Sequence, residues 1–155
     1  MILRKARVED ATKMVNLINH YAKQGIMLPK SLSRLYENIR DFSIIESDGN
    51  LIGCGALHIY WENLAELRSL VIEQNDQHKG YGKKLVTYLL KEAQEFNINV
   101  VFALSFKPEF FKKIGFHEVE KESLPHKIWK DCLDCPHFPN CNETALKIEL
   151  NKQAK

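Results

Sequence analysis

The sequence predicts an α/β (α+β) domain built on a central mixed, twisted β-sheet with helices on both faces. Three observations lead to this fold class. The chain has 155 residues and is 45% apolar, which is enough for one domain with a buried core. Two apolar strand patterns joined by a tight turn are followed by a strand, an amphipathic helix and another strand. Hairpin strands followed by a β-α-β unit give a sheet with both antiparallel and parallel neighbours.

A strand, two helices and a hairpin are predicted before residue 62. Asp10 can cap the first helix, since its carboxylate can accept the amide hydrogens of a first helical turn. Ser31 or Ser33 begins a second, shorter helix. The turn sequence SDGN joins the two strands of the hairpin. The predicted ranges are 1–6 for the strand, 10–23 for the first helix, 31–39 for the second helix and 42–61 for the hairpin.

Strands and helices alternate in the rest of the chain. After a strand at 65–73, apolar residues spaced three and four apart indicate the clearest amphipathic helix. Residues 100–106 are continuously apolar, as in a central strand, and Pro108 opens a short helix that Gly115 stops. The apolar face of the amphipathic helix comprises Leu85, Val86, Leu89, Leu90, Ala93 and Phe96. The last predicted elements are a strand at 117–121, a helix at 125–135 and a strand at 144–150.

Composition and charge narrow the possible functions. Charged residues make up 27% of the chain, but the net charge is only +2, so we expect no nucleic-acid partner. No apolar run reaches membrane-spanning length, and the start of the chain, MILRKARVEDATK, lacks the apolar segment of a signal peptide. We therefore expect no membrane association and one cytoplasmic domain, residues 1–155, with a cysteine-containing insert at about 124–142.

The stretch QHKGYGKK, residues 77–84, predicts an anion-binding turn at the start of the amphipathic helix. The first amides of a helix have no internal partner, and the helix dipole adds positive charge there. Gly80 and Gly82 permit backbone angles and close approaches that a Cβ would block, and three lysines add formal charge. This arrangement suits a phosphate or pyrophosphate. It is neither a Walker P-loop nor a Rossmann fingerprint.

The order Gln-x-x-Gly-x-Gly in this stretch resembles the pyrophosphate loop of the GNAT acetyltransferases, which bind acetyl-CoA. That family carries the loop between its fourth strand and third helix, where our predicted elements place it. A second stretch, FFKKIGF at Phe110–Phe116, resembles the FYxKxGF element that follows the family's fifth strand. The resemblance covers about residues 1–120 and implies the GNAT fold.

Longer stretches resemble one branch of that family, the short stand-alone amino-acid N-acetyltransferases of the N-acetylglutamate synthase type. The resemblance implies the α-amine of glutamate as acceptor and a product that enters arginine biosynthesis. Two alternatives stay open: another small amine, polyamine or protein amine as acceptor, or a CoA-binding sensor or interaction module with little turnover. Because family members often dimerise, the resemblance also favours a homodimer. The matching stretches are LPKSLSRLYENIRDF, LAELRSLVIE, VFALSFKPEFFKKIGF and LPHKIWKDCLDCPHFPNC.

The resemblance also implies which residues hold acetyl-CoA. The amides of Leu70 and Ile72 pair with the pantetheine arm, an amide near Val71 polarises the thioester carbonyl, and the amides of residues 78–83 hold the pyrophosphate. The predicted cofactor-binding residues are Leu70, Val71, Ile72, Gln77, His78, Lys79, Gly80, Tyr81, Gly82, Lys83 and Phe111.

Glu66 is the candidate general base, since it matches the acidic residue that histone-type members carry on the fourth strand. Strand alternation predicts that Glu66, Arg68, Leu70 and Ile72 share one face of the sheet. Many members have a tyrosine that protonates the leaving thiolate, but here that position is Phe111, which has no acidic proton. Ser105 is then a candidate donor.

A dicarboxylic acceptor needs cations to bind it. Arginine offers a bidentate fork to a carboxylate, and lysine offers a point charge. Each of these side chains is also consistent with a solvated surface charge. The candidates in the branch-like segments are Lys30, Arg68, Lys107 and Lys127.

Three cysteines gather near the end of the chain, as Cys132, Cys135 and Cys141. With His137 they have the donor types of a tetrahedral structural zinc site, although a second Cys-x-x-Cys pair is missing. Unliganded packed thiols and an oxidation-sensitive cluster are the alternatives. A bound metal would hold the insert together and would take no part in acyl transfer.

Overall fold

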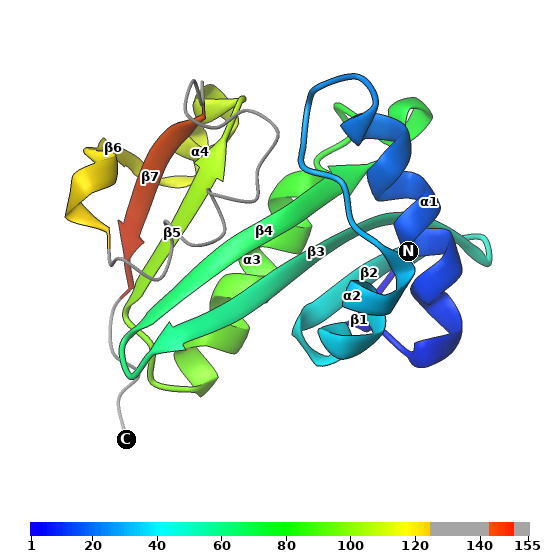
Figure 1. Cartoon of the computed structure of the whole chain (residues 1–155), viewed down its shortest axis with the longest axis horizontal. Coiled ribbons are helices and arrows are strands. Elements are labelled where there is room, and N and C mark those ends of the chain that lie inside the picture. The colour runs from blue at the N-terminus through cyan, green and yellow to red at the C-terminus, as the bar shows by residue number, and fades with distance from the viewer. Residues whose placement is uncertain (125–142, 151–155) are drawn as a thin grey trace.

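The structure, a computed structural model, describes residues 1–124 and 143–150. Within them, the helices and strands follow one another in the predicted order (Figure 1). No helix among these residues combines the length and the apolar character needed to cross a bilayer. The strands are β1 (Ile2–Lys5), β2 (Phe42–Ser47), β3 (Asn50–Trp61), β4 (Leu64–Ile72), β5 (Val100–Ser105), β6 (His117–Val119) and β7 (Thr144–Glu149). The helices are α1 (Ala11–Ala22), α2 (Leu32–Glu37), α3 (Tyr81–Glu95) and α4 (Pro108–Ile114).

The described strands form one mixed sheet in the order β1-β2-β3-β4-β5-β7-β6. β4 and β5 are parallel, and the other described pairs are antiparallel. A parallel pair needs a crossover connection, and α3 supplies it between β4 and β5. The predicted mixed sheet is confirmed.

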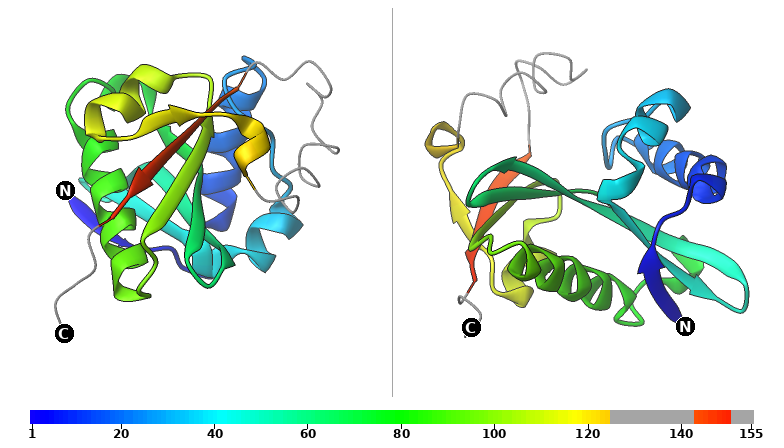
Figure 2. Two further views of the ribbon diagram at one scale, coloured as in Figure 1. Left: turned by 90° about the vertical axis from the view of Figure 1, so that its left-hand side faces the viewer. Right: turned by 90° about the horizontal axis from the view of Figure 1, so that it is seen from below.

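Helices cover both faces of this sheet. In the right-hand view of Figure 2, α1 and α2 lie on one face and α3 and α4 on the other. Neighbouring residues of β2 show the alternation: Ile44 packs in the cluster around α1, and Ile45 packs in the cluster around α3. The predicted placement of helices on both faces is confirmed.

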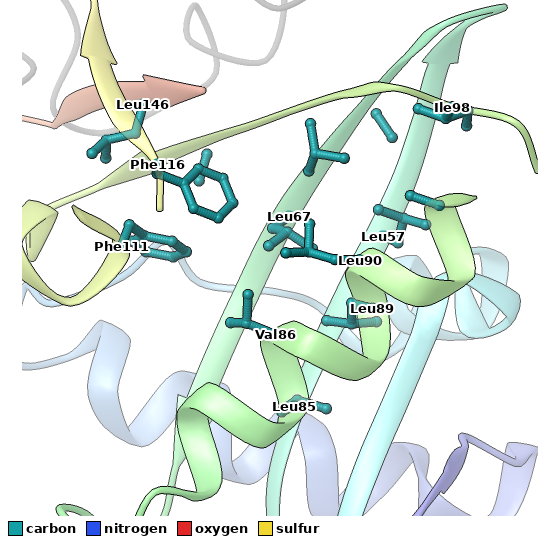
Figure 3. Close-up of a cluster of buried hydrophobic side chains, with 14 of the residues drawn as sticks. Leu57, Leu67, Leu85, Val86, Leu89, Leu90, Ile98, Phe111, Phe116 and Leu146 are labelled. Carbon is teal, nitrogen blue, oxygen red and sulfur yellow. The ribbon is translucent and has the colours of Figure 1, made fainter. Parts of the chain in front are cut away.

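The apolar stripe of α3 forms much of the core on its face. Leu85, Val86 and Leu89 are fully buried, and Figure 3 shows them directed toward the sheet residues Leu57 and Leu67. Burying one leucine side chain completely is worth roughly 1.5–3 kcal/mol, so this stripe fixes α3 against the sheet. The helix therefore presents its N-terminus at a defined place beside β4.

Phe96 does not belong to this stripe, so that part of the prediction was wrong. Its side chain is 58% exposed. The helix ends at Glu95, and Phe96 has φ −87° and ψ 5°, which is outside the helical range. Because the helix has ended, the Phe96 side chain does not continue the apolar face of α3.

The two predicted helix caps have different outcomes. Ser31 precedes α2, and its hydroxyl accepts a hydrogen bond from the Arg34 amide at 3.1 Å, as expected. Asp10 precedes α1, but its carboxylate makes no capping bond to that helix. It accepts instead from the Arg7 amide at 2.7 Å and from both terminal nitrogens of the Arg4 guanidinium, at 2.8 and 3.0 Å. Asp10 therefore pairs with Arg4 through two hydrogen bonds instead of capping α1.

Candidate active site

β4 and β5 run side by side at one end and diverge toward the other (Figure 1). Their pairing joins residues 64–67 to residues 100–103. β4 continues to Ile72 and β5 to Ser105. Beyond residue 67, the β4 backbone groups that face this side therefore have no partner from β5. The carboxyl ends of parallel strands are a common position for ligands in α/β sheets.

A β-bulge at Ser69 changes the face of the residues that follow it. The β3–β4 register shifts by one residue between the pairs Ala56–Arg68 and Cys54–Val71, and Ser69 has a φ of 55°. Leu70 and Ile72 consequently pack in the cluster around α3, whereas Val71 packs in the cluster around α1. The bulge adds one residue, so the prediction that Glu66, Arg68, Leu70 and Ile72 share a face was wrong.

The backbone amides of Leu70 and Ile72 point away from β3. The Glu73 amide donates to the Ile52 carbonyl of β3 at 2.7 Å, and the Ile72 carbonyl accepts from the Gln77 side chain at 2.9 Å. Since these groups alternate along a strand, the amides of Leu70 and Ile72 face the side where β5 has diverged. The same alternation directs the Val71 amide toward β3.

The N-terminus of α3 presents open backbone donors. Gly80 is the residue before the helix and has a φ of 84°, and a Cβ placed there would meet no atom within 4 Å. The first described helical bond runs from the Lys84 amide to the Gly80 carbonyl, at 3.1 Å. The amides of Tyr81, Gly82 and Lys83 therefore have no partner within the helix. Such open donors are what an anion-binding turn requires, and anion binding here stays a prediction.

Gly82 has a different role from Gly80. A Cβ at Gly82 would lie 3.1 Å from two ring atoms of Phe110 on α4, which is closer than ordinary van der Waals contact. The missing side chain thus lets α4 pack against the start of α3. Of the other residues in this turn, His78 is exposed with a φ of 65°, and Lys79 is exposed beside Asp76 at 3.5 Å.

Gln77 ties the turn to the rest of the fold. Besides its bond to the Ile72 carbonyl, its side-chain amide lies 3.4 Å from the hydroxyl of Tyr21 on α1. Burial, together with the nearby Glu73 carboxylate, raises the pKa of Tyr21, so this hydroxyl is protonated at neutral pH. The predicted cofactor-binding residue Gln77 is therefore a link between β4, α1 and the turn.

Glu66 is a buried member of a group of polar side chains on the face opposite α3. It is 7% exposed. Its Oε1 accepts from Arg68 Nε at 2.9 Å, lies 2.8 Å from Arg68 Nη2, and accepts from the Tyr60 hydroxyl at 3.2 Å. Arg68 also donates to the Tyr60 hydroxyl oxygen, and its guanidinium carbon lies 5.4 Å from the Tyr60 ring centre. The structure brings the predicted base and a predicted acceptor-binding residue into direct contact.

His58, on β3, and Asp41, just before β2, extend this group. His58 is directly opposite Glu66 in the β3–β4 register, and its Nδ1 lies 2.7 Å from Asp41 Oδ2. The sequence did not single out Tyr60, His58 or Asp41. The available signal was the alternation of His58 and Tyr60 on the strand that pairs with the one carrying Glu66.

The other predicted site residues that the structure describes have different surroundings from one another. The Ser105 hydroxyl, at the end of β5, accepts from the Lys107 amide at 2.9 Å. Lys107 itself is exposed before α4, and the backbone of Lys30 is held by the Asn19 side chain at 2.8 and 2.9 Å. Phe111 is buried with Phe116, and their ring centres are 5.2 Å apart.

The remaining predicted site residues lie outside the described part of the chain. Within residues 1–124 and 143–150, no group of three or more His, Cys, Asp or Glu side chains is placed to hold a metal ion. The candidates beyond these ranges are Lys127 for the acceptor and Cys132, Cys135, Cys141 and His137 for zinc.

Several known proteins are similar to this chain in sequence. Residues 11–118 match the family described as the acetyltransferase (GNAT) family. A Chlorobaculum tepidum protein named an uncharacterized N-acetyltransferase is 40% identical over 144 residues, which are 93% of each chain. A Mycobacterium tuberculosis protein named an amino-acid acetyltransferase is 36% identical over 133 residues, 84% of this chain and 76% of that one.

A solved structure is similar over nearly the whole chain. It is N-acetylglutamate synthase from Neisseria gonorrhoeae complexed with coenzyme A and N-acetyl-glutamate, with a TM-score of 0.90 and 31% identity. The match covers 97% of this chain but 35% of the other, so this chain spans only part of the length of that protein.

Proposed function

Because the chain belongs to the acetyltransferase (GNAT) family, we propose that it transfers the acetyl group of acetyl-CoA to the α-amine of L-glutamate. This is the N-acetylglutamate synthase reaction, whose product enters arginine biosynthesis. The observation that carries the proposal is the contact of buried Glu66 with half-buried Arg68, at the point where β4 and β5 diverge. It sets a base and a carboxylate-binding cation next to each other, as an amino-acid acceptor requires.

The residues around the diverging strands fit acetyl-CoA. The open backbone at Gly80 and the unpartnered first-turn amides of α3 suit a pyrophosphate. The amides of Leu70 and Ile72 can pair with an extended amide-containing arm as a neighbouring strand would. One of these two amides, rather than that of Val71, is also the candidate donor to the thioester carbonyl.

When bound, acetyl-CoA supplies an activated acetyl thioester, so the chain's own residues have few tasks. Glu66 accepts a proton from the acceptor's ammonium group, directly or through water, which frees the nitrogen lone pair. Arg68 pairs with an acceptor carboxylate. Ser105 is the candidate proton donor to the departing thiolate, since Phe111 has no acidic proton. Because Arg68 contacts Glu66, removal of the Arg68 side chain should affect both acceptor binding and turnover.

The test is a thiol-release assay with acetyl-CoA and a panel of amino acids, polyamines and lysine peptides, with the product identified by mass spectrometry. We expect saturable turnover that forms N-acetylglutamate. The variant Arg68→Ala should raise the KM for glutamate and lower kcat, whereas Arg40→Ala, at an exposed arginine, should change neither. Turnover with polyamines or peptides but not with glutamate would overturn the proposed acceptor. The cytoplasmic location and the homodimer stay predictions.

A further inference from the structure

We infer that Tyr60 is a positioning residue for acyl transfer, and that its hydroxyl group holds Glu66 and Arg68 in one fixed arrangement. The inference rests on the proposed role of Glu66 as the general base. It does not depend on which amine is the acceptor.

A second β-bulge directs Tyr60 toward this site. The β3–β4 register shifts between the pairs Ile59–Ala65 and Trp61–Leu64, so Tyr60 is the extra residue on β3. Bulges re-aim side chains and often lie next to active sites. Here the side chain of Tyr60 reaches residues of both neighbouring strands.

The Tyr60 ring is held on two sides. Its centre lies 5.7 Å from the ring centre of Phe102 on β5, in a tilted arrangement. The imidazole of His58 contacts it edge to face, at 4.9 Å. Phe102 pairs with Glu66 in the sheet, so the tyrosine reaches from β3 across β4 to the strand beyond. A ring fixed in this way gives its hydroxyl a defined position.

That hydroxyl closes a ring of three contacts. It donates to Glu66 Oε1 at 3.2 Å and accepts from Arg68 Nη2, while Arg68 Nε donates to the same Glu66 oxygen at 2.9 Å. Each of the three side chains thus contacts the other two. Glu66 is 7% exposed, so water replaces these partners poorly.

This arrangement matters most when Glu66 has taken up the acceptor's proton. The carboxyl group is then neutral, and its attraction to the Arg68 guanidinium falls. The hydroxyl oxygen and the ring face of Tyr60 still bind the guanidinium, since neither depends on the charge of Glu66. Tyr60 therefore holds Arg68 in place in both protonation states of Glu66. The arrangement of the site is thus preserved for the next turnover.

The test is the variant Tyr60→Phe, which removes one oxygen and keeps the ring. Loss of the fixed geometry should lower kcat about 10-fold, or ~1.4 kcal/mol, and leave the KM for acetyl-CoA within about twofold. The matched control is Tyr88→Phe, at a half-buried tyrosine of α3, which should leave kcat unchanged. Thermal unfolding of each variant is measured alongside.

A double-mutant cycle separates positioning from a general structural effect. If Tyr60 acts through Glu66, Tyr60→Phe should lower kcat less than about twofold when it is added to Glu66→Gln. An equal loss in both backgrounds, or an unchanged kcat in the single variant, would overturn the inference. If the panel shows that glutamate is not an acceptor, the proposed function is overturned. The same cycle, run with the amine that the panel identifies, then still tests the role of Tyr60. Full activity of Glu66→Gln would overturn both the proposed base and this inference.

Discussion

The two parts of the candidate site are built from different groups. The cofactor part, residues 77–83 with the amides of Leu70 and Ile72, is largely exposed and offers backbone donors. The acceptor part, Tyr60, Glu66 and Arg68, is buried or half-buried and offers side chains that contact one another. A ligand recognised by the chain's own backbone leaves a glycine pattern in the sequence. A ligand recognised by side chains from two strands leaves only scattered polar residues.

This difference predicts that substitutions in the two parts change different kinetic constants. Changes in the turn should act on the binding of acetyl-CoA, because the backbone there contacts no acceptor group. Changes in the acceptor part should act mainly on kcat and on the KM of the amine.

The largest effect is expected from Glu66→Gln. The amide keeps the size of the side chain but cannot take up the ammonium proton, so kcat should fall about 10²-fold or more. The KM for acetyl-CoA should stay within about twofold, as measured by initial rates at several concentrations of both substrates. Glu62→Gln, at an exposed residue of the β3–β4 turn, is the matched control and should behave as the unmodified protein. A variant at Glu66 that keeps half its activity contradicts the assignment.

Gly80→Ala should act on the cofactor part. Gly80 has a φ of 84°, so alanine there costs roughly 1–2 kcal/mol of backbone strain, although its Cβ would meet no atom within 4 Å. Relaxation of that strain should move the α3 amides and raise the KM for acetyl-CoA about 10-fold, a loss of ~1.4 kcal/mol.

Gly25→Ala is the control for backbone strain. Gly25 has a φ of 74° and equally open surroundings, but it follows α1. Both variants should lower the free energy of unfolding by a similar amount, and only Gly80→Ala should change the KM for acetyl-CoA. Equal kinetic effects would show that the α3 turn has no special part in cofactor binding.

A smaller effect is expected from Lys83→Gln. Lys83 is exposed in the first turn of α3, where charge interactions are weakened by water and salt. The Kd for CoA, measured by titration calorimetry, should rise about two- to threefold at low salt. The difference between the variant and the unmodified protein should nearly vanish at 0.5 M salt. A difference that is independent of salt would indicate a structural effect instead.

The smallest kinetic effect is expected from Asp10→Asn, which lies in neither part of the site. Arg4 lowers the pKa of Asp10 below its usual value of 3.8, mainly through its hydrogen bonds. The resulting stability is present above about pH 4 and is lost as pH falls through the lowered pKa. Denaturant unfolding at pH 7 should show a loss of about 1–3 kcal/mol, which shrinks toward acidic pH.

Kinetic constants of Asp10→Asn should match those of the unmodified protein. Glu9→Gln, at a 71% exposed carboxylate 3.7 Å from Arg7, should change stability by less than about 0.5 kcal/mol. A stability loss in Asp10→Asn that is the same at pH 7 and pH 3 would contradict the role of the charge.

Most of the fold could be predicted because local patterns agree with one another. The turn at Asp48 and Gly49, with φ values of 51° and 79°, follows from the Asp-Gly pair that such a hairpin turn favours. The stripe of α3 likewise follows from apolar periodicity, and the strand β5 follows from a continuous apolar run. Asp10 shows the limit: its carboxylate was expected at the helix, but an arginine from the neighbouring strand competes for it.

Glu66 and Arg68 were candidates from the sequence, but Tyr60 and its contacts with them could not be predicted because two bulges change the register. A regular hairpin that pairs Trp61 with Leu64 would set Ile59, not His58, opposite Glu66. The extra residue Tyr60 shifts that pairing, and Ser69 then moves the following side chains to the other face. Alternation counted from the sequence alone misses both shifts, since neither residue is a glycine that would signal a bulge.

The most direct test of this division is backbone hydrogen exchange with and without CoA. We expect slower exchange on CoA binding in peptides that cover residues 69–73, through the amides of Leu70 and Ile72, and in peptides that cover residues 78–83. We expect little change in residues 11–20 of α1, which packs on the opposite side of the sheet from α3. Protection confined to other segments, with none at the start of α3, would contradict the assignment of the cofactor site.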